Sequence, residues 1–285
     1  MKKWMTLMVA SVLTLGLAAC NSTATPTSET ADEKTSELTL KQVFDKSLEQ
    51  SESIKSLTAD IEMSQFIEVP SQNVAMDTVT NMTMDMFVDP LSIYQKGTTS
   101  TTVPGEDSSV QPQEVEIESY MTDEGFFMHH SMSAQWVKLP ADMYEQMMAT
   151  SQKQADPSQQ LKDLEVFMDD FTFEQTEDMY VLNLFASGDK FNELIKKQLT
   201  ETMPEMELDQ EEMLKDMNIE KVDYEIYIDK ETFNTTAFNM VLEMTVPVEG
   251  EEMKMSQDLK STFTKYNEIE PIKVPQEVLD NAQAM

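Results

Sequence analysis

Residues 74–88 read VAMDTVTNMTMDMFV, and this stretch decides the fold class. Six of its even positions carry apolar side chains, those of Val74, Met76, Met82, Met84, Met86 and Val88. Polar residues fall between them at Asp77, Asn81, Thr83 and Asp85. A period of two is typical of a strand with one buried face and one solvated face. We therefore predict a half-buried strand here.

The same alternation recurs along the chain and predicts further strands at 61–69, 115–121, 171–173, 180–185, 222–228, 238–246 and 253–263. Glycines at breaks in the pattern, such as Gly97 and Gly125, predict turns between strands. Helical spacing opens the domain at 38–56 and returns after Pro140, near 191–199 and from Asp209. The predicted order is helix, long meander, helices, long meander, which indicates an α+β fold.

The N-terminus predicts export. Lys2 and Lys3 precede an uncharged, largely apolar run from Trp4 to Leu17, which is the pattern of a signal peptide. The following Leu17-Ala18-Ala19-Cys20 resembles the lipobox of bacterial lipoproteins, in which the cysteine receives a lipid before cleavage. We expect a signal peptide over 1–19, a lipidated disordered tether over 20–37 and a single domain over 38–285.

The amino-acid composition limits the kinds of partner that this protein can bind. The chain has 53 acidic residues against 20 lysines, no arginine and a net charge of −33, which excludes a nucleic-acid binder. Cys20 is the only cysteine, so the domain has no disulfide and depends on a hydrophobic core. The partners we expect are the membrane, through the lipid on Cys20, and a lipid or amphiphile. The sequence names no protein partner.

The whole domain resembles the LolA/LppX/LprG-like lipoproteins, as a Gram-positive-type anchored member. The likeness rests on the lipobox, the first helix and long strands, Gly125-Phe126-Phe127, Trp136-Val137-Lys138-Leu139-Pro140 and the closing Pro271-Ile272-Lys273-Val274-Pro275. It implies a curved, incomplete antiparallel β-barrel whose concave apolar face is covered by helices and binds acyl chains. The absence of arginine departs from the soluble periplasmic carrier, which uses one to hold its closed state.

The 25 methionines suggest either copper(I) ligands or an apolar lining. Their strand periodicity favours packing or a cavity, and we expect no cofactor and no metal site. His129 and His130 are adjacent, so a strand would point them to opposite faces. The predicted cavity residues are Met63, Met76, Met82, Met84, Met86, Trp136, Met147, Phe238, Met240, Leu242, Met244 and Met255.

Enzyme motifs are missing from the sequence, including Gly-x-Ser-x-Gly, a phosphate-binding glycine loop and His-Glu-x-x-His, so we expect no catalysis. Two functions remain. The first is a membrane-anchored extracytoplasmic lipoprotein that binds a lipid or another hydrophobic ligand in a Met-rich cavity. The alternative is a non-catalytic cell-surface interaction or signalling module with a packed core.

Overall fold

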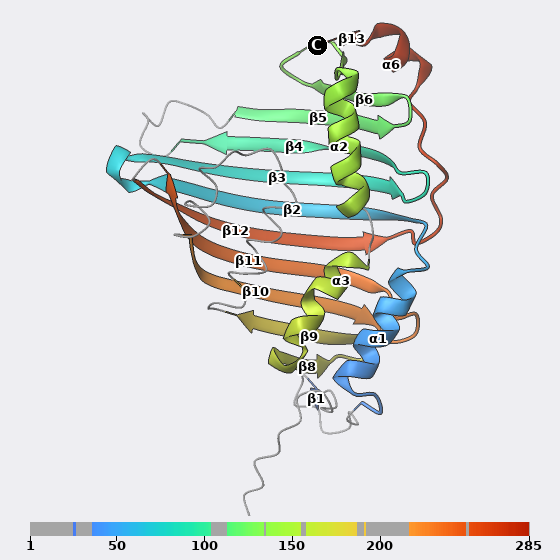
Figure 1. The fold of residues 1–285 in the computed structure, drawn as a ribbon, viewed down its shortest axis with the longest axis vertical. Coiled ribbons are helices and arrows are strands. Elements are labelled where there is room, and N and C mark those ends of the chain that lie inside the picture. The colour runs from blue at the N-terminus through green and yellow to red at the C-terminus, as the bar shows by residue number, and fades with distance from the viewer. Residues whose placement is uncertain are drawn as a thin grey trace, which may run out of the picture.

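A computed structural model describes residues 25–26, 36–103, 113–133, 135–154, 158–186, 191, 217–248 and 251–284. These residues form one large curved sheet that does not close into a barrel, with a few helices (Figure 1). The strand order is β1-β8-β9-β10-β11-β12-β2-β3-β4-β5-β6-β7-β13. The predicted curved, open sheet is therefore confirmed, and the described fold is mostly sheet with few helices.

The long strands follow the predicted meanders. The first group comprises β2 (Ser56–Val69), β3 (Val74–Phe87), β4 (Ser92–Thr102), β5 (Gln113–Thr122), β6 (Gly125–His130) and β7 (Val137–Lys138). The second comprises β8 (Phe171–Gln175), β9 (Met179–Ala186), β10 (Asn218–Asp229), β11 (Thr235–Val248) and β12 (Glu251–Thr264). Antiparallel pairing of β12 with β2 joins the two meanders, with Leu259 opposite Met63.

Both ends of the described sheet order are short parallel strands that the sequence did not predict. β1 (Thr25–Pro26) pairs with β8, and β13 (Gln283–Ala284) pairs with β7. Strand β1 falls within the tether predicted over 20–37. Most of the remaining predicted tether lies outside the described residues.

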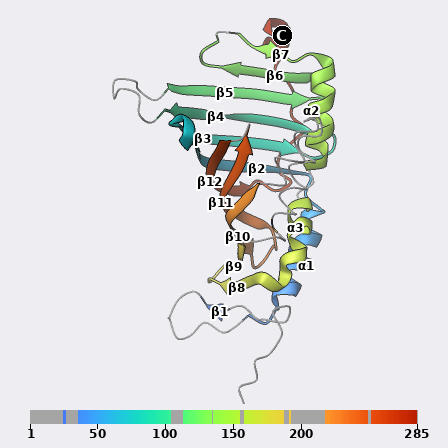
Figure 2. The same cartoon turned by 60° about the vertical axis from the view of Figure 1, so that its left-hand side comes forward.

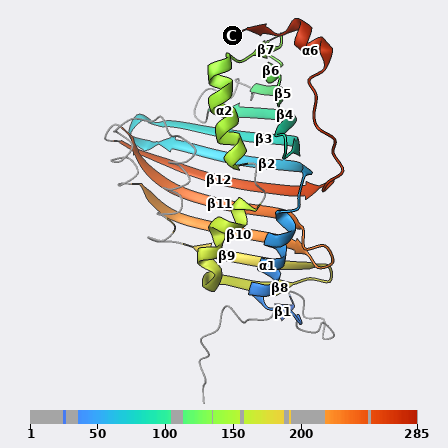
Figure 3. The ribbon, with the colours of Figure 1, turned by 45° about the vertical axis from the view of Figure 1, so that its right-hand side comes forward.

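Three helices lie on the same face of the sheet, near one end of its long strands (Figure 1). They are α1 (Leu40–Ser51), α2 (Ala141–Gln154) and α3 (Gln159–Leu164), and the turned views show them on that face (Figures 2 and 3). We call this face the inner face and the opposite one the outer face. Two 3-10 turns, η2 (Pro70–Gln72) and η3 (Glu165–Asp170), and α6 (Gln276–Asn281) complete the elements.

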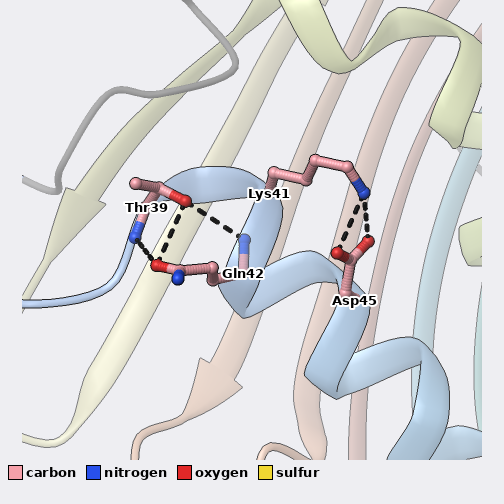
Figure 4. A network of polar contacts seen from close by, with 4 residues as sticks. All are labelled: Thr39, Lys41, Gln42 and Asp45. Carbon is pink, nitrogen blue, oxygen red and sulfur yellow. Dashed lines mark hydrogen bonds and ion pairs between the residues drawn. The ribbon is translucent and has the colours of Figure 1, made fainter.

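Helix α1 begins at a capping box (Figure 4). The backbone N–H of Gln42 donates to Oγ1 of Thr39 at 3.3 Å, and the N–H of Thr39 donates to Oε1 of Gln42 at 2.9 Å. These bonds satisfy backbone donors that a helix start leaves unpaired. The helix then buries Leu40, Val43 and Phe44 against the sheet.

The inner face carries two apolar clusters. The larger one, which we call the β8–β12 cluster, joins α1, α3 and η3 to strands β8 to β11, and its members include Phe44, Leu182 and Ile226. The smaller one, the β2–β5 cluster, contains Leu57, Met86 and Met121 and packs against α2. A third cluster lies on the outer face, where Phe127 meets Val274 and Val278 of the C-terminal segment.

Some local predictions need correction. The first helix ends at Ser51 rather than near Ser56. Gly97 lies within β4 rather than in a turn, and a Cβ there would stand 2.0 Å from the carbonyl oxygen of Asn81. Glycine thus permits a close approach of two strands. Gly125 does follow a turn, with φ of 128°. The helices predicted near 191–199 and from Asp209 fall almost wholly outside the described residues.

Candidate ligand-binding face

Side-chain charge separates the two faces of the sheet. Residues directly opposite on paired strands share a face, so the strand register assigns each side chain. On β2–β5 and β8–β11, none of the described inner-face side chains is charged. On β12 the charged exception is Glu251, the first residue of the strand. An uncharged face is unexpected in a chain with net charge −33.

The outer face collects the charged groups of the same strands. On β5, Glu114, Glu116 and Glu118 alternate with inner-face residues, as the sequence predicts. Ion pairs form here between Lys96 and Glu118 at 3.9 Å and between Lys221 and Asp223 at 2.8 Å. The hydrogen bond to Asp223 raises the pKa of Lys221. The acidic surface therefore faces away from the helices.

Eleven of the twelve predicted cavity residues lie on the inner face or pack against it. The strand residues are Met63, Met76, Met82, Met84, Met86, Phe238, Met240, Leu242, Met244 and Met255. Met147 reaches the β2–β5 cluster from α2. The predicted register of these strands thus places the methionines on one surface.

Burial divides these residues into two groups. Phe238, Leu242, Met244 and Met86 are buried, with 4 to 8 % of their surface exposed, so they are core residues. The others are half-buried, apart from Met76, which is 37 % exposed. A ligand can contact this second group without displacing the core.

Trp136 does not join the inner-face residues. Its ring lies 5.6 Å from that of Tyr120 and 5.5 Å from that of His129, both outer-face residues, and it packs against the cluster around Phe127. Trp136 therefore lies apart from the other predicted cavity residues, on the opposite face of the sheet. The reason is strand parity, because Trp136 shares the face of Lys138, whose partner is Phe127.

The sequence analysis missed polar residues within the inner face. Gln65, Thr78 and Thr80 continue the alternation that includes Met63 and Met76, and Gln257 lies opposite Gln65 on β12. The predicted cavity set contains only the apolar members of this pattern. The signal was available, since a polar residue at an apolar position of a half-buried strand breaks the usual pattern.

Metal-ligating and titratable side chains are the remaining candidates for a site on the described residues. Among them, no three His, Cys, Asp or Glu side chains are placed to hold a metal ion. His129 and His130 point to opposite faces, as predicted from their adjacency. Hydrogen bonds from the backbone of Thr232 lower the pKa of Asp229, which holds the turn between β10 and β11. Burial raises the pKa of Tyr224 to about 12, with a further contribution from Asp163.

Within the described parts of the chain, no helix combines the length and apolar character needed to cross a bilayer.

Three solved structures are similar to this chain at low sequence identity. The lipoprotein LppX of Mycobacterium tuberculosis matches at 12 % identity and a TM-score of 0.37, over 83 % of this chain and 98 % of that one. A β-barrel-like DUF1849 protein from Brucella abortus matches at 9 % identity and a TM-score of 0.19, over 74 % and 99 %. A DUF1329 family protein from Desulfovibrio piger matches at 10 % identity and a TM-score of 0.23, over 80 % and 93 %.

The comparison with curated proteins found no match. A sequence model of DUF6612, a family of unknown function, matches residues 39–283, and the chain therefore belongs to that family.

Proposed function

We propose that this protein is a non-catalytic extracytoplasmic lipoprotein, anchored to the outer face of the cell membrane through lipid on Cys20, that binds a lipid or another amphiphile on its inner face. The anchor rests on the sequence alone, since Cys20 lies outside the described residues. The ligand rests on one structural observation, which is the uncharged inner face of a strongly acidic protein.

The inner face has the physical character that an apolar ligand needs. Burying an unpaired charge beside an acyl chain would cost several kcal/mol or more, and the described inner-face strand residues avoid this except at Glu251. Methionine is flexible and polarizable, so Met82 and Met84 could adapt to chains of different shape. Met76 and Val74, at 37 % and 49 % exposed, leave part of this face open to solvent.

A second candidate function is favoured by the buried members of the predicted set. Phe238, Leu242 and Met244 belong to the closely packed β8–β12 cluster, as expected for an interaction or signalling module with a packed core. In that case the acidic outer face would meet a protein partner. The two functions differ in whether the half-buried methionines take up a ligand.

Native mass spectrometry of the unlipidated domain, purified without detergent, tests the first function. We expect an additional mass that organic solvent removes and that fragments as a lipid or another amphiphile. A domain that has only its own mass, and that gains none after incubation with bacterial lipid extract, would favour the second function.

Anchoring has its own test. We expect Cys20→Ser to abolish metabolic labelling with a fatty acid analogue and to leave precursor or release soluble protein. A mutant that labels normally and still fractionates with membranes would contradict the proposed anchor.

A further inference from the structure

A row of polar side chains crosses the inner face perpendicular to four strands. Gln257 lies opposite Gln65, Gln65 opposite Thr78, and Thr78 opposite Thr101. Thr80 and Thr99 form a neighbouring pair in the next row of the same face. We call these six residues the polar band; all six are half-buried.

The side chains of the polar band meet one another across the strands. Nε2 of Gln65 lies 3.5 Å from Oε1 of Gln257, and the hydroxyls of Thr80 and Thr99 lie 3.1 Å apart. The hydroxyls of Thr78 and Thr101 are 3.5 Å apart. Amides and hydroxyls both donate and accept hydrogen bonds, and these long contacts leave capacity for another partner.

The polar band lies between two apolar regions. On one side, Met82 and Met84 lead along β3 toward α2, where Tyr144 and Met147 pack. On the other side, Ile67 pairs with Met76, which is 37 % exposed. From Thr80 to Met86 the strand spans about 20 Å at the usual rise per residue, which is long enough for a long acyl chain.

The residues around the polar band indicate which charge a ligand headgroup could carry there. A phosphate or carboxylate would find no arginine in the chain and no lysine among the described inner-face strand residues. A cationic headgroup would find the carboxylates of these strands on the outer face, apart from Glu251 at the start of β12, six residues from Gln257. A neutral group with hydroxyls matches the available donors and acceptors.

Building on the proposed function, we infer that the polar band is a headgroup site for an amphiphile with an uncharged, hydroxyl-bearing headgroup, and that the acyl chain lies along β2 and β3 toward α2. The shared chemistry is that of a glycerol ester or a sugar-bearing lipid. The band orients the ligand, and the methionines hold its tail.

Photo-crosslinking of the full-length protein in its own membranes tests this inference. The probes share one acyl chain carrying a diazirine and an alkyne, and they end in glycerol, a hexose, a carboxylate or a plain methyl group. Two variants each remove one polar pair of the band with little change in volume, Thr80→Val/Thr99→Val and Gln65→Met/Gln257→Met. Thr98→Val/Thr102→Val on the outer face of the same strand β4 is the matched control.

We expect wild-type protein and the control to crosslink a hydroxylated probe at lower concentration than the carboxylate probe. Each band variant should need about tenfold more of that hydroxylated probe, as the loss of one or two hydrogen bonds predicts. Crosslinking of the methyl-ended probe should not change, which also shows that the variants keep their inner face intact. The better of the glycerol and hexose probes identifies the source of the headgroup.

Two results would overturn the headgroup site while leaving the proposed function in place. In the first, the wild type takes up all four probes equally and the variants match it. In the second, the band variants lose the methyl-ended and hydroxylated probes to the same extent. If the wild type crosslinks none of the probes, the proposed function fails, and the headgroup site with it.

Discussion

The two halves of the inner face use the same strand alternation for different purposes. In the β8–β12 cluster, the inner positions carry branched and aromatic side chains such as Leu182 and Ile226, each 0 % exposed under α1 and α3. On β3 and β4, most of the corresponding positions carry methionine, threonine or glutamine, and most are half-buried. The first half has the packing of a hydrophobic core, and the second has the character of a surface that can accept a ligand.

Alternation alone therefore does not distinguish a core from a binding surface. Both halves avoid charge on the inner face, so charge does not distinguish them. Side-chain shape differs, because branched and aromatic residues have few rotamers and define a core, whereas methionine fills irregular space. Substitutions in each half test whether the two halves differ in stability and in ligand uptake.

The largest effect is expected from Leu242→Asp in the β8–β12 cluster. Leu242 is 7 % exposed, and an unpaired carboxylate there should lower the free energy of unfolding by several kcal/mol or prevent folding. The adjacent Glu243→Ala, on the outer face, should change it by about 0.5 kcal/mol or less. Urea unfolding followed by circular dichroism measures both. Equal effects would mean that the two faces of β11 are wrongly assigned.

Introducing a tryptophan into each half tests whether that half has room for a larger side chain. Met244 is 8 % exposed within the β8–β12 cluster, so Met244→Trp should overpack it and cost about 1–3 kcal/mol. Met84 is half-buried beside the β2–β5 cluster, so Met84→Trp should cost less but should block crosslinking of the methyl-ended probe. If Met84→Trp destabilises the protein as much as Met244→Trp, the second half is also a packed core.

Much of this arrangement could be predicted from the sequence, because alternation is a local signal. The even-numbered residues from Val74 to Met86 and those from Phe238 to Val246 share the inner face, as their spacing indicates. Spacing could not indicate that Met244 is buried and Met76 exposed. That difference depends on which helices cover each strand, and such contacts join residues far apart in the chain.

The short helices and strands have no such periodic signal in the sequence. Helix α3, from Gln159 to Leu164, is too short to establish a helical period, and β1 and β13 have two residues each. The parallel pairing of Thr25 with Glu174 depends on a partner strand far along the sequence. Trp136 was misplaced because it adjoins β7, which contains only Val137 and Lys138, so alternation could not indicate its face.

Alkaline pH should weaken the buried half through Tyr224. Its pKa is raised to about 12 in the folded protein, chiefly by burial, against 10.0 for the exposed side chain. The folded state therefore keeps the phenol protonated where the unfolded state loses its proton. The resulting stability is complete below pH 10 and is lost as the pH rises toward 12, at about 1.4 kcal/mol per pH unit.

Tyr224→Phe isolates this contribution from the titration of the lysines. Between pH 9 and pH 11 the wild type should lose about 1.4 kcal/mol more unfolding free energy than the variant. Urea unfolding at each pH measures the difference. An identical pH dependence of the two proteins would contradict the assignment to Tyr224.

The smallest effect is expected at the start of α1, which covers only the buried half. Thr39→Ala removes the side-chain acceptor for the N–H of Gln42 and should cost about 1 kcal/mol, whereas Thr39→Ser should retain most of the stability. Lys41→Ala breaks an ion pair with Asp45 in which both side chains are about half exposed, and should cost less than about 0.5 kcal/mol. Because α1 packs on the β8–β12 cluster and not on the β2–β5 cluster, Thr39→Ala should leave probe uptake unchanged under conditions where the protein is folded. Reduced uptake by folded Thr39→Ala protein would show that the two halves are coupled through the sheet.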